Sequence, residues 1–327
     1  MNTRTFGTLG TPVGEVGLGT WQLGGGWGDV PDSEAFATLR AAVEAGTTLF
    51  DTADVYGMGR SETLIGRFLK ESKAKIFIAT KLGRFSPPGW PANFTRDGIR
   101  KHTEASLKRL GVDSLDLTQL HCIPAAELEK GEVFEHLREL KREGKIRSFG
   151  ASVESMDEAL TCLRHEGVAA LQIIFNIFRQ KPIDTLFAEA KRKKVALLVR
   201  LPLASGLLGG KMTRATVFGN DDHRNFNRNG EQFNVGETFA GLPFEKGVDL
   251  ADELKAFVPH GSALADMALR WCLDYDAVTV IIPGARNPAQ ARSNARASAV
   301  PPLPPALHER LANFYRAKVA GNIRGPY

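Results

Sequence analysis

Residues 48–57 read Thr48-Leu49-Phe50-Asp51-Thr52-Ala53-Asp54-Val55-Tyr56-Gly57, an apolar run that ends in an acid, with a phenol five residues further on. The apolar part has the character of a buried strand, and the acid and phenol fall at its end and in the following loop. Two later strand-like runs also lead into a reactive side chain, because Lys81 follows residues 76–80 and His121 follows residues 115–120. Repetition of this kind predicts one site assembled from several strand ends.

The same strand-and-helix unit repeats along the chain. Short, apolar, β-branched runs indicate strands of a parallel sheet that is covered on both faces, and amphipathic patterns between them indicate helices. Strands are predicted at residues 15–18, 48–51, 76–80, 115–120, 146–151, 170–175, 195–201 and 278–282. Helices are predicted at residues 33–45, 61–69, 95–110, 133–143, 155–165, 184–193, 262–273 and 288–297. Eight such units fit a closed (β/α)8 TIM barrel better than an open sheet with a switch point.

Three additions to this α/β barrel are expected. Residues 4–14 predict an N-terminal β-hairpin, and residues 306–320 predict a C-terminal helix that packs on the barrel exterior. Residues 204–248, after the seventh strand, form a long connection that predicts either a lid or cofactor clamp on the catalytic face, or a disordered segment. No linker pattern divides the chain, so we expect a single domain over residues 1–327. Ser33, Ser61, Thr95, Ser155 and Ser262 are the predicted helix caps.

Composition excludes several classes of protein. The 327 residues are 43% hydrophobic, which is enough for a large core, and the net charge of +5 is spread along the chain, which argues against a nucleic-acid partner. Three distant cysteines give neither a disulfide framework nor a CxxC pair, and Cys122 is expected to be a buried thiol. No run approaches the ~18 apolar residues of a membrane span, and no signal peptide is evident, so we expect a cytoplasmic protein. No His, Cys and carboxylate spacing suits a metal.

The phenol needs help to exchange a proton at neutral pH, because free tyrosine has a pKa of about 10. An ammonium at ~4 Å contributes about 4 kcal/mol at an effective dielectric constant of ~20, enough to lower that pKa by ~3 units. Lys81 is the candidate ammonium, Asp51 would hold it protonated, and His121 would fix a substrate oxygen beside Tyr56. Such a group is suited to giving a proton to a carbonyl oxygen as hydride arrives, or to the reverse reaction.

The chain resembles the aldo-keto reductase family over nearly its whole length. Family-like segments are found in order at residues 17–21, 50–62, 79–81, 106–111 with His121, 202–211 and 282–286. The resemblance implies an eight-stranded barrel, a catalytic group of Tyr56, Lys81, Asp51 and His121, and NADPH as cofactor, with NADH as the alternative. The expected activity is reduction of aldehydes or ketones, and no GxGxxG motif of a Rossmann domain is present. It also resembles a bacterial branch in which Arg precedes Pro-Leu-Ala-Ser-Gly, as Arg200 does before residue 202.

Cofactor contacts are implied by the same motifs. The nicotinamide end is expected at Thr20, Trp21, Asp51, Ser152, Gln172 and Arg200; the pyrophosphate at Leu203, Ser205, Gly206, Leu208 and Lys211; and the adenosine 2′-phosphate and adenine at Gly284, Arg286, Gln290 and Asn294. Two positions depart from the family pattern. Val153 stands where an Asn is frequent, and Arg200 stands where many members stack an aromatic ring on the nicotinamide. A guanidinium can also stack flat, but it adds positive charge beside the ring.

Trp21, Trp27, Phe85 and Trp90 are the expected substrate contacts, because aromatic walls suit small carbonyl compounds, including sugars. Two alternatives to carbonyl reduction stay open. One is a sugar or alcohol dehydrogenase that works in the oxidative direction. The other is a cofactor-sensing regulatory subunit of a membrane channel, which would bind cofactor with little turnover. The residue pattern fixes neither the oligomeric state nor the physiological substrate and its stereochemistry.

Overall fold

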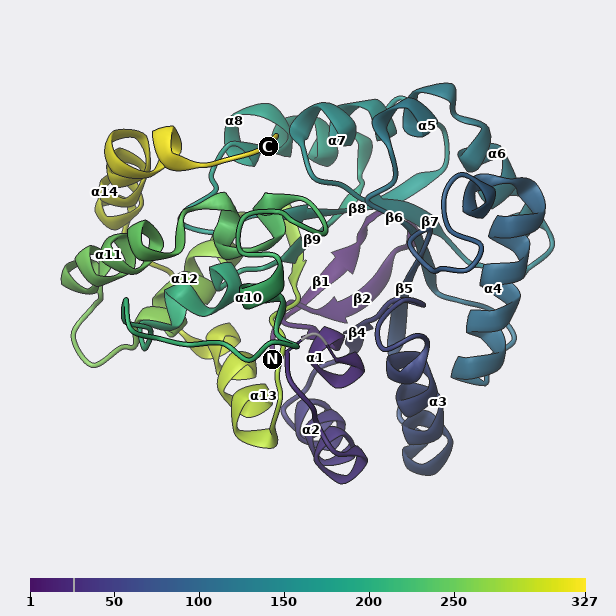
Figure 1. Ribbon diagram of the computed structural model, residues 1–327, viewed down its shortest axis with the longest axis horizontal. Helices are drawn as coiled ribbons and strands as arrows, with labels where there is room; N and C mark the ends of the chain where they lie inside the picture. Colours follow the sequence, from purple (N-terminus) through teal and green to yellow (C-terminus); the bar gives the residue numbers. More distant parts are fainter. Residues whose placement is uncertain (26) are drawn as a thin grey trace.

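The computed structural model describes residues 1–25 and 27–327, and its centre is a sheet of parallel strands that curls into a barrel (Figure 1). Strand order in the sheet follows the chain, and the parallel bridges Val16–Ile281 and Gly19–Gly284 join its two ends. The strands are β3 (Leu18–Gly19), β4 (Leu49–Asp51), β5 (Phe77–Leu82), β6 (Leu117–His121), β7 (Phe149–Ser152), β8 (Val168–Ile174), β9 (Ala196–Arg200) and β10 (Val278–Ile281). The predicted (β/α)8 TIM barrel is therefore confirmed.

Helices follow the strands and cover the outside of the barrel (Figure 1). The longer ones are α2 (Asp32–Glu44), α3 (Arg60–Ser72), α4 (Arg96–Leu110), α6 (Glu132–Arg142), α7 (Met156–Cys162), α9 (Phe187–Lys193), α11 (Phe244–Leu254), α12 (Leu264–Leu273), α13 (Pro288–Ala295) and α14 (Pro305–Phe314). Short helices are α1 (Trp21–Gly24), α5 (Ala125–Lys130), α8 (Pro182–Thr185) and α10 (His223–Phe226). Within residues 1–25 and 27–327, no helix has both the length and the apolar character needed to cross a membrane.

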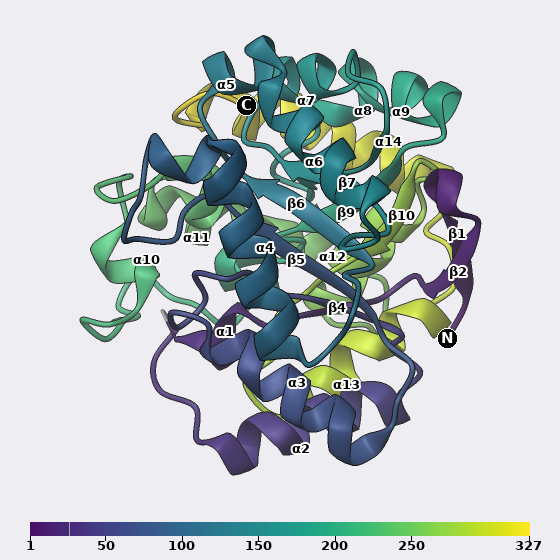
Figure 2. The ribbon, with the colours of Figure 1, turned by 90° about the vertical axis from the view of Figure 1, so that its right-hand side faces the viewer.

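The predicted N-terminal hairpin closes one end of the barrel. Strands β1 (Thr3–Phe6) and β2 (Thr11–Gly14) pair antiparallel, and the ring of Phe6 packs on Phe77 with centroids 4.6 Å apart. Phe6 belongs to an apolar cluster inside the barrel that includes Leu117, Leu198 and Val280. Figure 2 shows this hairpin at one end of the barrel and α10 and α11 at the other. The other end of the barrel, where α10 lies, is therefore the end available for a functional site.

Two predicted helix caps are confirmed and three are wrong. Thr95 Oγ1 accepts a hydrogen bond from Gly98 N, and Ser155 forms a capping box with Glu158. Ser61 lies inside α3, where its hydroxyl instead bonds the hydroxyls of Thr20 and Thr52. Ser33 does not cap α2, because the helix already begins at Asp32 and Pro31 holds the cap position. Ser262 does not cap α12, because that helix begins at Leu264 and Ala263 holds the cap position.

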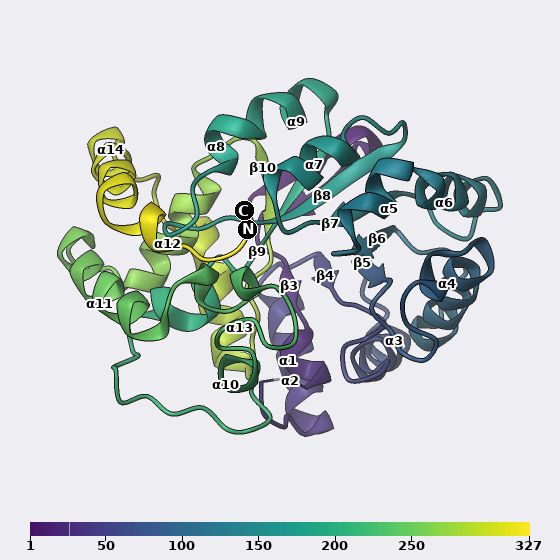
Figure 3. The same ribbon diagram turned by 45° about the horizontal axis from the view of Figure 1, so that its top comes forward.

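The long connection after β9 is folded. Residues Ala204–Gly209 form a 3₁₀ turn with Leu207 and Leu208 buried, and α10 follows. The unpredicted helix α11 begins at Phe244 and precedes α12, the helix predicted from residue 262. Figure 3 shows α10 near α1, and a bridge between Trp27 and Asp222 joins the two regions. The C-terminal helix α14 is present and ends at Phe314, followed by a wider turn at Tyr315–Val319.

Candidate functional site

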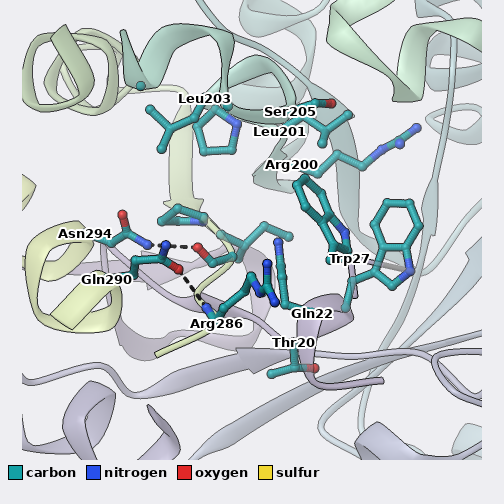
Figure 4. A pocket seen from close by; sticks show the side chains of 18 of the residues that line it. Thr20, Gln22, Trp27, Arg200, Leu201, Leu203, Ser205, Arg286, Gln290 and Asn294 are labelled. Atoms are coloured by element: carbon teal, nitrogen blue, oxygen red, sulfur yellow. Dashed lines mark hydrogen bonds between the residues drawn. The ribbon is translucent and has the colours of Figure 1, made fainter. Parts of the chain in front are cut away.

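A cavity of about 490 Å³ opens at the carboxyl ends of the barrel strands. It is walled by the ends of β3, β4, β6, β8, β9 and β10 and by the segment after β9. Sixteen of the predicted site residues line it: Thr20, Trp21, Trp27, Asp51, Tyr56, His121, Gln172, Arg200, Leu203, Ser205, Gly206, Lys211, Gly284, Arg286, Gln290 and Asn294. In Figure 4, Gln290 and Asn294 lie on one side of the pocket and Trp27 on the other, with Arg286 between them.

The four predicted catalytic residues meet at the inner end of this cavity. Lys81 is 1% exposed, and its Nζ donates to Asp51 Oδ1 at 2.6 Å and to the Tyr56 hydroxyl at 3.4 Å. Asp51 Oδ2 also accepts from Gln172 Nε2 at 2.7 Å, so both carboxylate oxygens are fixed. The rings of Tyr56 and His121 stand edge to face with centroids 5.8 Å apart. Lys81 is placed behind the phenol rather than in the cavity wall.

Burial and charge set the protonation states of this group. Burial alone would lower the pKa of Lys81, but the Asp51 carboxylate and the Tyr56 phenol raise it, so the lysine is an ammonium ion. Burial raises the pKa of Tyr56, and the nearby Lys81 charge only partly offsets this, so the lowered pKa expected from the sequence is not found in the structure. The phenol is therefore protonated and can act as a donor. Burial, together with Arg84 and Lys81, holds the pKa of His121 well below its ordinary value, so its imidazole is neutral.

Other residues of the cavity wall have the features of a cleft for a phosphorylated ligand. Ser205 and Gly206 are in the left-handed conformation, and Lys211 and Arg286 supply positive charge. Gly284 is closely packed, since a Cβ there would lie 2.1 Å from the Gln22 amide. Asn294 Nδ2 donates to Gly284 O at 3.1 Å, and Arg286 N donates to Gln290 Oε1 at 2.8 Å. These residues fit the pyrophosphate and adenosine phosphates of a dinucleotide.

Four predicted contacts lie outside the cavity wall. Ser152 is buried, 3.5 Å from the sulfur of Cys122, and Leu208 belongs to the hydrophobic core. Phe85 packs on His102, and Trp90 is 53% exposed, with its Nε1 donating to Gly83 O. Of the predicted substrate contacts, the structure therefore brings only Trp21 and Trp27 to the cavity.

The segment after β9 contributes residues that the sequence pattern did not identify. The imidazole of His223 lies 4.6 Å from the ring of Trp21 and 4.4 Å from that of Trp27, measured between centroids. The adjacent Arg224 lies over Trp27 at 4.6 Å, and it lines the cavity together with Glu237. Gln22, from α1, is another lining residue that the sequence pattern did not identify. The length of the segment and its position after a strand were the available signals; its fold was not evident from sequence.

Arg200 does not lie free beside the cavity. Its Nη2 donates to Val153 O at 3.0 Å, and its Nη1 is 3.3 Å from Glu237 Oε2. In Figure 4 its side chain extends away from Asn294 and Gln290. Val153, where the family pattern often has Asn, thus offers its carbonyl to the guanidinium. Cys122 lies 3.5 Å from Arg200 Nη2, and burial raises the pKa of its thiol, so it is a packed rather than a reactive cysteine.

Cys122, Glu154 and Glu237 have ligand atoms within 4.8 Å of one another, a spacing that could suit a metal. However, Arg84 Nη2 already binds both carboxylates, at 3.0 Å from Glu154 and 2.8 Å from Glu237. Guanidinium groups at these oxygens oppose a cation by charge and by occupancy.

Comparisons with known proteins agree with this geometry. The model of the Aldo/keto reductase family matches residues 15–316. The chain is 32% identical over 299 residues to aldo-keto reductase YhdN of Bacillus subtilis, covering 89% of this chain and 86% of that protein. It is 29% identical over 318 residues to the NADH-specific methylglyoxal reductase of Escherichia coli, covering 91% and 93%. It matches the structure of the glycerol dehydrogenase AKR11B4 from Gluconobacter oxydans with a TM-score of 0.79, at 30% identity over 97% of this chain and 96% of that one.

Proposed function

Since this chain belongs to the aldo/keto reductase family, we propose that it reduces an aldehyde or ketone with NADPH, using Tyr56 as the proton donor. The observation that carries the proposal is the chain of contacts from Asp51 through Lys81 to the Tyr56 hydroxyl, at 2.6 and 3.4 Å. This chain of contacts ends at Tyr56, which lines the cavity beside the neutral imidazole of His121. A bound nicotinamide cofactor would supply the hydride for the carbonyl carbon.

Each residue of the chain has a separate role in this proposal. Tyr56 donates its proton to the carbonyl oxygen, and the Lys81 ammonium stabilises the phenolate that develops. Asp51 keeps Lys81 charged and in place. His121, being neutral, donates an N–H to the same oxygen and orients it. The stacked ring of Trp21, 5.8 Å from that of Tyr56, keeps water from the phenol.

Arg286 and Lys211 support NADPH as the cofactor. Both line the cavity, and the motif resemblance assigns them to the adenosine and pyrophosphate groups. Arg286 would bind the 2′-phosphate that distinguishes NADPH from NADH. The name of the E. coli relative specifies NADH, so the proposed preference for NADPH rests on these two residues of this chain. The same groups work in reverse for alcohol oxidation, so a dehydrogenase direction uses the same site.

The test is a Tyr56→Phe variant, with Tyr275→Phe as the matched control. Tyr275 is packed against Phe175 and Trp271, away from the cavity. We expect Tyr56→Phe to bind NADPH within about threefold of the wild type, measured by quenching of tryptophan fluorescence. Its kcat for aldehyde reduction should fall by about 10²- to 10⁴-fold, the usual contribution of a positioned acid. Undiminished turnover in Tyr56→Phe would rule out the assigned donor, and cofactor binding without turnover in the wild type would favour the regulatory alternative.

A further inference from the structure

Glu237 brings a carboxylate to the wall of the cavity that Tyr56 also lines. It lies at the end of the 3₁₀ turn Val235–Glu237, and its side chain is 7% exposed and lines the cavity with Tyr56 and Arg200. Its position is fixed through the main chain, because Ser205 Oγ donates to Glu237 O at 3.3 Å and accepts from Phe239 N at 3.1 Å. A buried carboxylate at such a position must have partners that hold it there.

Two guanidinium groups hold this carboxylate. Arg84 Nη2 donates to Oε1 at 2.8 Å, and Arg200 Nη1 lies 3.3 Å from Oε2. Burial alone would raise the pKa of Glu237, but Arg84 and Arg200 lower it to about 2, so the side chain is ionised. Each oxygen has one of these ion-pair partners, and the Glu154 carboxyl also hydrogen-bonds Glu237. A carboxylate has about four lone-pair sites, so one is left for a further hydrogen bond. Glu237 therefore retains the capacity to accept a hydrogen bond from a ligand.

The charges around Glu237 exclude some ligand classes. Arg84 and Arg200 already balance its charge, together with that of Glu154, whose pKa burial and Glu237 raise to about 7. An ammonium-bearing substrate would meet no unbalanced negative charge here. A carboxylate-bearing substrate would need a free guanidinium fork, but both Arg200 Nη atoms are occupied, by Val153 O and Glu237.

We propose that Glu237 is a specificity-determining residue that selects neutral carbonyl substrates with a hydroxyl group on the carbon next to the carbonyl. This inference rests on the proposed carbonyl reduction at Tyr56. The substrate carbonyl oxygen is bound by Tyr56 and His121, and the adjacent hydroxyl donates to Glu237. A purely apolar aldehyde would displace water from Glu237 and return no hydrogen bond, which is unfavourable.

The test compares kcat/KM for carbonyl compounds of matched size in the holoenzyme with NADPH. The series is propanal, which has no hydroxyl; lactaldehyde, with one at the adjacent carbon; glyceraldehyde, with two; and glyoxylate, with a carboxylate. Rates are corrected for the fraction of free carbonyl. We expect lactaldehyde to exceed propanal by about 10- to 100-fold, the effect of one hydrogen bond to a charged group. Glyceraldehyde should match or exceed lactaldehyde.

Glu237→Gln provides the decisive variant and Glu154→Gln its matched control. Glu237→Gln keeps the shape but makes the acceptor neutral, so the lactaldehyde-to-propanal ratio should fall about 5- to 10-fold. Glu154 binds the same Arg84 but is not among the residues that line the cavity, so Glu154→Gln should leave the ratio unchanged. The ratio within one variant is independent of the amount of folded enzyme, so partial loss of stability does not obscure the result.

The outcomes separate this inference from the proposed function. An unchanged ratio in Glu237→Gln, an equal fall in Glu154→Gln, or a wild-type preference for glyoxylate would each overturn the role of Glu237. None of these results would affect the Tyr56 assignment. Absence of turnover with all four compounds would instead remove the proposed function, and with it the premise of the inference.

Discussion

Replacing Lys81 by Met should remove most of the catalytic activity while leaving the cavity in place. Lys81 is 1% exposed and lies behind the phenol, so a Met side chain of similar length can occupy its position. The change removes the ammonium that lies 3.4 Å from the Tyr56 hydroxyl. In the proposed mechanism, that charge stabilises the phenolate that develops as the proton leaves.

The size of the effect follows from the distance. Two unit charges 3.4 Å apart interact by about 5 kcal/mol at an effective dielectric constant of ~20. If the proton is fully transferred in the transition state, the whole of this is lost, and kcat falls by about 4000-fold. If the proton is half transferred, about 2.5 kcal/mol is lost, and kcat falls by about 70-fold. The expected decrease lies between these limits.

The measurement is kcat for aldehyde reduction under saturating cofactor, beside the cofactor dissociation constant and the melting temperature. Lys81→Met leaves Asp51 buried without its ion-pair partner, which costs about 3–5 kcal/mol of stability. The double variant Asp51→Asn, Lys81→Met removes that uncompensated charge, so stability should recover while activity does not. A decrease in kcat of less than tenfold in Lys81→Met, with cofactor still bound, would refute the electrostatic role of Lys81.

Two further predictions concern charge elsewhere in the site. Asp54 is buried, its Oδ2 lies 3.6 Å from His102 Nδ1, and burial, together with Glu62, raises its pKa to about 8. The folded state therefore holds a proton that the unfolded state releases near pH 3.8, so the free energy of unfolding should decline from about pH 4 to about pH 8, by up to roughly 6 kcal/mol. Urea titrations should show this slope in the wild type and its loss in Asp54→Asn; parallel curves would contradict it. Arg286→Ala should weaken NADPH binding about 10- to 100-fold and NADH binding little, whereas Lys211→Met should weaken both, as measured by tryptophan quenching; equal losses for both cofactors in Arg286→Ala would exclude a 2′-phosphate contact.

The side chains at the strand ends were the part of the candidate site that the sequence predicted best. Asp51, Tyr56, Lys81 and His121 are brought together because each lies at or just after a parallel strand, and all such ends face one side of a barrel. Helix caps were harder to predict, because the hydroxyl of a serine before a helical pattern can bond other groups than the helix N-terminus. Ser61 was predicted to cap α3, but its hydroxyl joins Thr20 to Thr52 across neighbouring strand ends.

The substrate wall could not be predicted from local pattern. Trp90 follows the same strand as Lys81, yet its indole bonds Gly83 O and remains largely exposed. Glu237 instead reaches the cavity through an ion pair with Arg84, 153 positions away in the chain. Such a contact depends on the three-dimensional path of the segment after β9, and neither periodicity nor composition encodes that path.

Ser205 makes the two halves of the cavity interdependent. It lies in the 3₁₀ turn expected to approach the cofactor pyrophosphate, and its hydroxyl bonds the main chain on both sides of Thr238. The backbone that would contact the cofactor is therefore tied directly to the backbone that carries Glu237. Because the strand-end group at Tyr56 is fixed separately by Lys81 and Asp51, changes in this segment can alter which carbonyl compound fits without disturbing the proton donor. In the proposed mechanism, the chemistry thus belongs to rigid strand ends, and the selection of substrate belongs to a segment whose position also depends on the cofactor side of the cavity.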